Sequence, residues 1–299
     1  MSDILHIESV SQINEMIGNE KLKHPLIALL EPSKVKTLPE IKQKIVLDLY
    51  SLSLKSGSEC KIKYGRQNYD FQEGTLVFLA PGQTIEPISK SEVTDTEGWT
   101  LVFHPDLIRK TTLGNKINEY AFFYYDSNEA LHVSNQERVI ITDIAKAIKN
   151  EYSQNIDEYS KELIVSNIEL LLNYCKRFYS RQMITRTNVT KDIVNQFEKL
   201  LKSYFDSQQP KSYGLPSVKF CSQEMGYSTN YLSDLLKKET GKNTKEHIQF
   251  YLIEKAKVML LGTSTPINQI AYSLGFKYPQ HFSTLFKKKT GMSPVEYRI

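Results

Sequence analysis

The sequence has little cysteine and no long apolar run, and each shortage excludes a class of protein. Its 299 residues include only Cys60, Cys175 and Cys221, an odd number at long spacings. This pattern fits neither a disulfide framework nor a zinc site, and we interpret each cysteine as a small buried apolar residue. No stretch approaches the roughly 18 apolar residues of a membrane helix, and the N-terminal residues do not resemble a signal peptide. The sequence therefore predicts a cytoplasmic protein without a membrane partner.

Patterns that carry catalytic chemistry are also missing. The chain contains no nucleophile-elbow motif and no glycine-rich phosphate loop. We therefore predict no catalytic residue, no metal and no cofactor, and we do not expect an enzyme.

Size and composition predict two globular domains of ordinary size. Apolar residues make up 40% of the chain and charged residues 24%, as in typical folded proteins. The charge is uneven, because residues 186–299 carry 17 Lys and Arg against 9 Asp and Glu, whereas residues 1–185 carry 21 against 25. A basic C-terminal part favours a polyanionic partner at that end, although an uneven surface without function would give the same count.

The stretch from about Lys44 to Phe103 predicts short β-strands. Ile45, Leu47 and Leu49 alternate with their neighbours in a run that continues to Leu54. Further runs lie at residues 60–64, 69–71, 75–79, 84–88 and 99–103, separated by glycine, proline and polar turns. Many short strands at close spacing are typical of a small sandwich or barrel.

Two amphipathic helices are predicted next, over about residues 137–152 and 158–180. Their apolar residues recur at helical spacing, and we expect the two helices to pair antiparallel. Their apolar faces need a cover, which either the strands or a second copy of the chain can provide. Residues 183–189 are the predicted linker, so that the domains extend over residues 1–182 and 190–299.

The C-terminal part contains an internal repeat. Residues 230–241, NYLSDLLKKETG, align with residues 280–291, QHFSTLFKKKTG. Each copy predicts a short helix that ends at Met225 or Leu274, a glycine turn, and a second helix that begins near Ser228 or Pro279. The repeat therefore predicts two tandem helix-turn-helix units.

The second helix of each copy has an apolar stripe and a polar stripe on opposite sides. The apolar stripes consist of Leu232, Leu235 and Leu236 in the first copy and Phe282, Leu285 and Phe286 in the second. Short polar side chains near the start of a helix suit contacts with base edges in the major groove. We predict such contacts from Asn230, Ser233, Asp234, Gln280, His281 and Thr284.

Basic and hydroxyl side chains flank these polar stripes and are expected to contact phosphates, which gives affinity without sequence information. The predicted phosphate contacts are Thr229, Lys237, Lys238, Lys287 and Lys288. A merely solvated helix face would show similar residues, but two such faces in register within a repeat favour DNA. Asp234 has an alternative, a local ion pair with Lys237 or Lys238.

A single helix is predicted between the two copies, from Thr244 to Leu261. At about 1.5 Å per residue it spans roughly 27 Å, close to the roughly 34 Å of one DNA turn. The two second helices are therefore expected in successive major grooves, and DNA must bend if their separation falls short.

Residues 190–299 resemble the DNA-binding domain of AraC/XylS-type transcription regulators. The second copy carries the family signature in three pieces, INQIAYSLGF at 267–276, HFSTLFKK at 281–288 and TGMSPVEYR at 290–298. The first copy is similar at 226–233, GYSTNYLS, and at 237–241, KKETG. It departs at Cys221 and Ser222, where the family often has Leu and Ala.

The resemblance implies an all-α domain of seven helices, promoter binding and control of transcription, usually through RNA polymerase. It also implies a sensing or dimerising domain over residues 1–182, where residues 71–83, FQEGTLVFLAPGQ, resemble the cupin-type barrel of many such regulators. The expected fold is thus α+β with two domains, a cupin-like β-barrel with two flanking helices and a seven-helix domain. We expect a bacterial homodimer that binds double-stranded DNA.

Enzymatic cupins hold iron or manganese with clustered His and Glu, but residues 44–103 contain no histidine. His6, His24, His104 and His132 are scattered, and we interpret them as surface or core residues. A small-molecule effector pocket is a separate hypothesis, and ordinary core packing would use the same aromatic residues. The side chains expected to line the barrel interior are Tyr50, Tyr64, Arg66, Tyr69, Phe71 and Trp99.

Three functional hypotheses follow. The first is a homodimeric DNA-binding regulator that is modulated by a small effector or by dimerisation. The second is a cupin-type metal enzyme with an auxiliary DNA-binding tail, which the missing histidines disfavour. The third is a regulator without an effector, in which the barrel serves only as a dimer scaffold.

Overall fold

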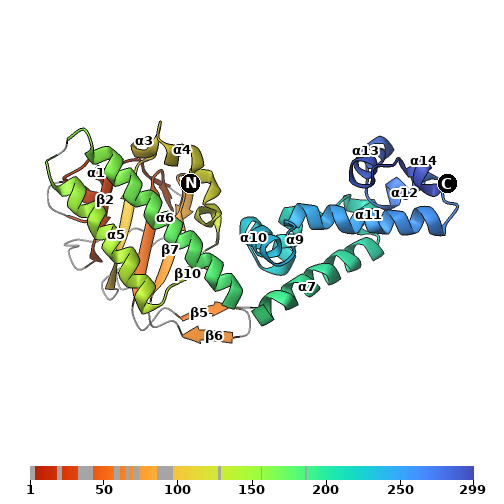
Figure 1. The fold of residues 1–299 in the computed structure, drawn as a ribbon, viewed down its shortest axis with the longest axis horizontal. Helices are drawn as coiled ribbons and strands as arrows, with labels where there is room; N and C mark the ends of the chain where they lie inside the picture. Colours follow the sequence, from red (N-terminus) through yellow and green to blue (C-terminus); the bar gives the residue numbers. More distant parts are fainter. Residues whose placement is uncertain are drawn as a thin grey trace. The chain divides into compact units, whose positions relative to one another are not determined.

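The computed structural model divides the chain into two units, Met1–Thr185 and Arg186–Ile299 (Figure 1). The described residues are 4–18, 22–32, 43–56, 61–64, 67–70, 74–85, 97–126, 129–155, 157–185 and 187–299. The division falls within residues 183–189, the predicted linker, whose described residues belong to the ends of two helices.

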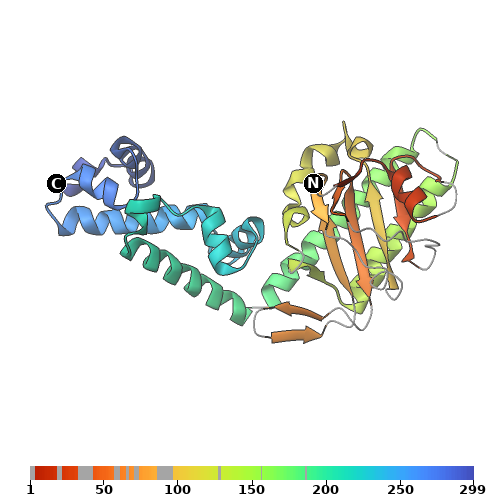
Figure 2. The same ribbon diagram turned by 180° about the vertical axis from the view of Figure 1, so that it is seen from behind.

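The first unit is built around a five-stranded antiparallel sheet with the strand order β10-β7-β4-β9-β2 (Figures 1 and 2). The strands are β2 (Ile27–Leu30), β4 (Tyr50–Ser56), β7 (Thr75–Leu79), β9 (Glu97–Phe103) and β10 (Leu131–His132). The pairing of β4 with β9 runs from Tyr50 opposite Phe103 to Ser56 opposite Glu97. These two long strands therefore form the centre of the sheet together with β7.

Two smaller sheets accompany it. The three-stranded sheet has the order β1-β3-β8, with β1 parallel to β3 and β3 antiparallel to β8. Strands β5 and β6 form a hairpin. The bounds are β1 (Leu5–Ile7), β3 (Ile45–Leu47), β5 (Lys61–Tyr64), β6 (Gln67–Asp70) and β8 (Gln83–Ile85), and helix α1 (Val10–Met16) follows β1.

The five-stranded sheet buries both of its faces, because successive side chains of a strand point to opposite sides. Leu52, Leu54 and Leu101 belong to a large core that includes residues of two long helices. Ala28 and Val102, on the other face, belong to a smaller core with residues of the three-stranded sheet. The first unit is thus a small sheet, a large sheet and a layer of helices.

The described strands form three separate sheets and no closed barrel. The predicted sheet-rich fold is therefore present, whereas the strands that the structure describes show no barrel closure. The run from Ile45 to Leu54, predicted as continuous, is interrupted at Asp48 and Leu49. The buried residues change there from odd to even positions, since Leu47 and Leu49 pack in the small core and Leu52 and Leu54 in the large one. The chain crosses from one sheet to the other at this point.

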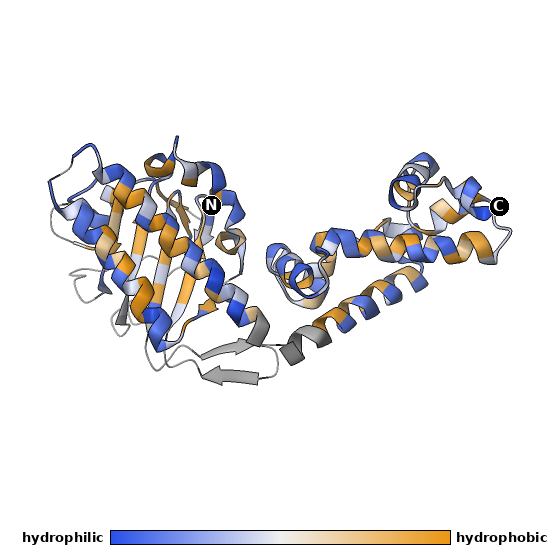
Figure 3. Ribbon diagram, viewed as in Figure 1, coloured by the Kyte–Doolittle hydropathy of each residue, from blue (hydrophilic) through white to orange (hydrophobic). Residues whose placement is uncertain are grey.

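Helices α5 (Asn135–Ser153) and α6 (Ser160–Thr185) cover the large sheet, at the positions predicted from periodicity (Figure 1). A capping box between Ser134 and Glu137 begins α5. Ile141, Ile148 and Leu172 are completely buried, and each such side chain contributes about 1.5–3 kcal/mol to stability. Figure 3 shows the apolar strands beneath these two helices.

Short helical segments connect β9 to β10 and close one end of the large core. They are α3 (Pro105–Ile108), α4 (Thr112–Lys116), η2 (Ile117–Glu119) and η3 (Ala121–Tyr124). Phe122 and Phe123 of η3 are buried and contact the ring of Phe78 on β7. This aromatic cluster is core packing.

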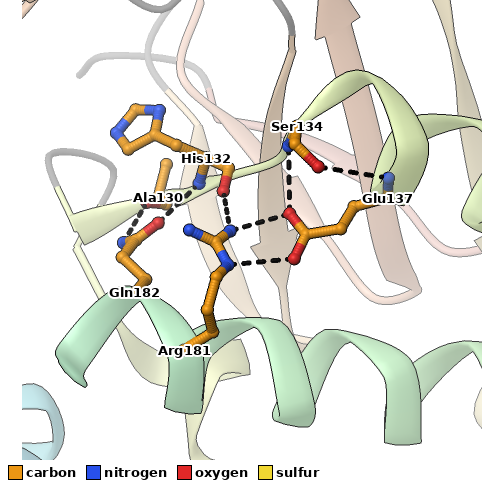
Figure 4. Close-up of polar contacts among 6 residues, drawn as sticks. All are labelled: Ala130, His132, Ser134, Glu137, Arg181 and Gln182. Atoms are coloured by element: carbon orange, nitrogen blue, oxygen red, sulfur yellow. Dashed lines mark hydrogen bonds and ion pairs between the residues drawn. The ribbon is translucent and has the colours of Figure 1, made fainter. Parts of the chain in front are cut away.

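A polar clamp joins α6 to the edge strand β10 and to the start of α5 (Figure 4). The Arg181 guanidinium donates to both carboxylate oxygens of Glu137, at 2.9 and 2.8 Å, and to the backbone oxygen of His132 at 2.8 Å. Gln182 accepts from the backbone N–H of His132 at 2.8 Å and donates to the oxygen of Ala130 at 3.2 Å. The clamp thereby satisfies backbone groups at the edge of the sheet, which would otherwise lack partners.

The second unit consists of helices joined by short turns over residues 187–299. Its helices are α7 (Thr187–Asp206), α8 (Gln209–Tyr213), α9 (Val218–Met225), α10 (Thr229–Thr240), α11 (Thr244–Gly262), α12 (Ile267–Ser273), α13 (Pro279–Thr290) and α14 (Pro294–Arg298). The resemblance implies seven helices, and the short α8 is the additional one. The helix predicted over residues 244–261 is α11, which begins with a capping box between Asn243 and Glu246.

Two turn glycines in this unit have different surroundings. Gly226 and Gly275 both have a positive φ, 73° and 97°. A Cβ on Gly226 would meet no atom within 4 Å, whereas a Cβ on Gly275 would lie 2.7 Å from the backbone carbon of Gly214. The oxygen of Gly214 in turn accepts a hydrogen bond from the Tyr204 hydroxyl at 2.9 Å. The second turn therefore packs backbone against backbone on the loop that precedes α9.

We predict that Arg181→Gln lowers the free energy of unfolding of the first unit by about 1–2 kcal/mol, because charge-assisted hydrogen bonds are lost. Urea unfolding followed by fluorescence reports on this unit, since Trp99 is the only tryptophan in the chain. Lys116→Gln, at an exposed position of α4, is the matched control and should change little. Equal losses in the two variants would contradict a stabilising clamp.

We predict unequal effects of alanine at the two turn glycines. Gly226→Ala should cost the second unit about 1 kcal/mol of backbone strain. Gly275→Ala should cost at least about 2 kcal/mol, because the backbones must also separate. The measurement is urea unfolding followed by circular dichroism at the helix band. A Gly275→Ala variant as stable as Gly226→Ala would show that the contact with Gly214 is unimportant.

Candidate nucleic-acid interface

The internal repeat of the sequence is present as two helix-turn-helix units. Helices α9 and α10 form the first unit, and α12 and α13 form the second. Helix α10 begins after the N-cap Ser228, whose hydroxyl accepts from the backbone N–H of Tyr231, and α13 begins at Pro279. The predicted helix starts and turn glycines are therefore confirmed.

The apolar stripe of α10 is buried in the second unit, and that of α13 is buried except at Leu285, which is partly exposed. Leu232, Leu236, Phe282 and Phe286 are completely inaccessible to solvent, and Leu235 is nearly so. Burial of these stripes fixes the rotation of each helix about its own axis. The opposite stripe of each helix must then face outward.

The outward side of α13 is open to solvent. Gln280, His281 and Thr284 are all exposed, as are Lys287 and Lys288 one turn later. The Thr284 hydroxyl donates to the backbone oxygen of Gln280 at 2.9 Å, so its oxygen still has capacity to accept from a base amino group. This helix thus presents three polar side chains followed by lysines, as the sequence predicts.

The outward side of α10 is less accessible. Of its predicted contact residues Lys237 is exposed, whereas Thr229, Asn230, Asp234 and Lys238 are partly covered. Burial lowers the pKa of Lys238, and the neighbouring carboxylate of Glu239 acts in the opposite direction. The two units therefore offer unequal surfaces.

Ser233 lies on the flank of α10 that packs against α11. Its hydroxyl shares a 2.9 Å hydrogen bond with the hydroxyl of Thr244, which is completely buried. The equivalent Ser283 of α13 donates instead to the oxygen of Pro279 in its own helix, at 3.3 Å. A base contact by Ser233, predicted from helical spacing, would have to break its bond to α11.

A threonine closes the C-terminal end of both second helices, and helical spacing did not single it out. Thr240 donates to the oxygen of Leu236 at 2.8 Å, and Thr290 donates to that of Phe286 at the same distance. Gly241 and Gly291 follow with left-handed φ values of 75° and 83°. The repeated letters KxTG in the sequence are the signal for this cap.

His247 of α11 joins the cap of the first unit. Its Nε2 lies 2.6 Å from the Thr240 hydroxyl, which already donates to Leu236 and accepts from the N–H of Lys242. The tautomer of the imidazole decides which of these two atoms is the donor. Burial lowers the pKa of His247, and the ammonium of Lys242 lowers it further against the opposing effect of Glu198 and Glu246. A neutral imidazole thus connects α10 to α11.

The predicted effector pocket falls mostly outside the described part of the chain. Arg66 and Phe71 lie outside it, as do the side chains of Tyr64 and Tyr69, whose backbones belong to β5 and β6.

Tyr50 and Trp99 are buried on the side of the large sheet that faces the helices. The ring of Tyr50 stacks on Phe103 with centroids 5.0 Å apart, and the indole N–H of Trp99 donates to the Thr142 hydroxyl at 3.1 Å. Strand alternation thus directs both side chains away from the space between the two sheets. Neither lines the interior that the sequence prediction assigned to them, and an effector pocket there stays a prediction.

The cysteines and histidines show no metal-binding arrangement within the described residues, where no cluster of three His, Cys, Asp or Glu side chains could hold an ion. Cys175 and Cys221 are buried, and burial raises the pKa of both thiols, that of Cys221 to about 12. Cys60 lies outside the described residues.

Among the described helices, none has the length and apolarity needed to cross a membrane.

A family model described as a helix-turn-helix domain matches residues 221–299. The uncharacterized HTH-type transcriptional regulator YijO of Escherichia coli is 25% identical over 192 residues, 64% of each chain. The lactose operon transcription activator of Staphylococcus xylosus is 20% identical over 249 residues, 83% of this chain and 82% of that protein. The solved C-terminal domain of the response regulator yesN from Fusobacterium nucleatum is 30% identical over 38% of this chain and 99% of its own, with a TM-score of 0.31.

These matches cover different shares of this chain and of the relatives' own lengths. The match to YijO spans somewhat less than two thirds of that protein, and matches to several other curated relatives span between 10% and 34% of their lengths. The family match covers α10 to α14, including the signature residues of the second copy. Residues 221–299 are therefore a helix-turn-helix domain of the AraC type.

Proposed function

We propose that this chain is a sequence-specific DNA-binding regulator of transcription that reads two successive major-groove segments. The observation that carries the proposal is the repeated helix-turn-helix, in which buried stripes turn the polar residues of α10 and α13 outward. Relatives named as a transcriptional regulator and a transcription activator support it. The basic character of residues 186–299 favours the same partner.

The geometry of the second unit suits two adjacent grooves. Helix α11 has 19 residues and therefore spans about 28 Å, against roughly 34 Å for one turn of DNA. Figure 1 shows α9 and α10 at the N-terminal end of α11 and α12 to α14 along its C-terminal half, in agreement with the contacts of these helices. The shortfall of a few ångströms is expected to bend the DNA toward the protein.

The contact residues divide by chemistry. Gln280, His281 and Thr284 are assigned to base edges in one groove, and Asn230 and Asp234 to base edges in the other, because amide, imidazole and carboxylate groups distinguish bases. Ser233 can contact a base edge only after its hydrogen bond to Thr244 breaks. Hydroxyl and ammonium groups are assigned to phosphates, and these residues are Thr229, Lys237, Lys238, Lys287 and Lys288.

The first unit is proposed to dimerise through the outer sides of α5 and α6. Ile140, Leu163 and Leu170 are large apolar side chains that are 36–48% exposed there. Figure 3 shows apolar residues among polar ones on this outer side. Apolar residues grouped on a surface mark interaction sites more often than chance, and a second copy is the partner that symmetry provides.

The complete assignment is a cytoplasmic homodimer that binds promoter DNA, contacts RNA polymerase and responds to a small effector through its first unit. The competing metal-enzyme hypothesis has no supporting observation in the described residues, where no metal-binding cluster is found. Genome-wide mapping of bound sites would identify the operator, and failure to find any preferred sequence would contradict the proposal.

On the operator so identified, we predict distinct effects of base-contacting and phosphate-contacting residues. Gln280→Ala and Thr284→Ala should each reduce discrimination at one or two base pairs by about 1–3 kcal/mol. Lys288→Ala should weaken binding equally on all sequences and reduce the slope of log affinity against log salt by about 0.9. Titration of labelled duplexes at several salt concentrations gives both quantities. If all three variants behave alike, the division into base and phosphate contacts is wrong.

We also predict that the double variant Leu163→Glu with Leu170→Glu sediments as a monomer at concentrations at which the unchanged chain is a dimer. Charges placed in an apolar contact are costly to bury without partners. Val258→Glu is the matched control, because Val258 is an exposed apolar residue of the second unit. A monomeric unchanged chain at micromolar concentration would remove dimerisation from the proposal.

A further inference from the structure

A cavity of about 400 Å³ lies on the helix-covered side of the large sheet, between β2, β4, β9 and α5. Its volume falls in the range of small-molecule sites, roughly 300–1,000 Å³. It is distinct from the space between the two sheets, because its wall is formed by α5 and not by the three-stranded sheet.

The floor of the cavity is apolar and held in place. Leu29, Leu54 and Trp99 are each less than 10% exposed and line it together. The Trp99 indole is fixed by its hydrogen bond to Thr142 on α5. The backbone N–H of Leu29, on the edge strand, donates to the Tyr152 hydroxyl near the end of α5 at 2.9 Å. The floor is therefore formed before any ligand arrives.

The rim of the cavity carries two cationic and two anionic side chains, and one of the carboxylates is paired with a lysine outside the lining. Glu31 lies on the strand side and is paired with Lys149, the ammonium nitrogen 2.8 Å from the carboxylate. Helix α5 supplies Arg138, Asp143 and Lys146. Within the described part of the chain, Arg138 and Lys146 form no ion pair. Two cationic side chains thus stand over an apolar floor, and Asp143 lies between them without an ion pair to any described residue.

We propose that this cavity binds a small organic anion with a flat apolar body, whose ring rests on Leu29, Leu54 and Trp99 and whose carboxylate meets Arg138. The guanidinium matches the two oxygens of a carboxylate, and Lys146 adds a second positive charge from the next turns of α5. The cavity is the effector site of the proposed regulator, and this regulatory role rests on the proposed function. Binding of the anion to the cavity does not depend on the proposed function.

Trp99 makes a site-specific test available, because it is the only tryptophan of the chain and forms part of the floor. The full-length protein is titrated with phenylacetate and with phenylethanol, its neutral counterpart, while tryptophan fluorescence is recorded. Phenylacetate should give a saturable change and bind about tenfold more tightly than phenylethanol, since a charged hydrogen bond is added. Equal affinity for the two compounds would overturn the proposed role of the cations.

Variants that remove one positive charge test where the carboxylate of the ligand binds. Arg138→Gln should weaken phenylacetate binding roughly tenfold and leave phenylethanol unaffected, and Lys146→Gln should give a smaller loss in the same direction. Lys116→Gln, at an exposed position of α4 away from the cavity and from the proposed dimer surface, is the matched control. Circular dichroism verifies that the variants are folded. A fluorescence change that does not saturate, or that is the same in all four proteins, would overturn the site.

Operator affinity with and without phenylacetate separates this proposal from the function on which its regulatory role rests. Specific DNA binding by a protein whose fluorescence shows no saturable change would remove the cavity proposal and leave the regulator intact. Saturable, Arg138-dependent binding by a protein that recognises no DNA would support the site and remove the proposed function.

Discussion

Burial of the apolar stripe on each second helix is the constraint on which the candidate interface depends. Leu232 and Leu236 in α10, and Phe282 and Phe286 in α13, are fully buried. Each is worth about 1.5–3 kcal/mol, so turning either helix to present another face would cost more than the 1–3 kcal/mol that a good base contact supplies. The protein core therefore determines which side chains can contact the DNA. The operator sequence determines only which of these side chains find a matching base.

The unequal openness of the two units has the same origin. In α13 the polar stripe is exposed over its whole length, whereas in α10 the flank residue Ser233 is bonded to the buried Thr244. The sequence predicts the apolar stripe because helical spacing within one helix defines it. It does not predict the bond of Ser233, because that partner lies across a turn on another helix. The same limit applies to the contact between His247 and Thr240.

The first unit shows a similar division between local and remote information. Alternation identifies the strands at residues 45–54 and 99–103, and the change from odd to even buried positions after Leu49 marks the passage between sheets. The order β10-β7-β4-β9-β2 pairs segments far apart in the chain, which no local pattern specifies. The described strands do not close into the expected barrel for this reason. The side of the sheet to which the Tyr50 and Trp99 side chains point depends on which sheet face packs against the helices. No local pattern specifies that face either.

Helix α5 contributes residues both to the cavity and to the proposed dimer surface. Ile141 and Ala145 anchor it on the sheet, Arg138 and Thr142 line the cavity, and Ile140 is exposed on its outer side. A ligand shifts an equilibrium only by its difference in affinity between two states. An anion bound between the fixed floor and Arg138 would favour positions of α5 close to the sheet. Any such shift of α5 also moves Ile140, because Arg138 and Ile140 belong to the same helix. The strength of dimerisation then depends on the ligand.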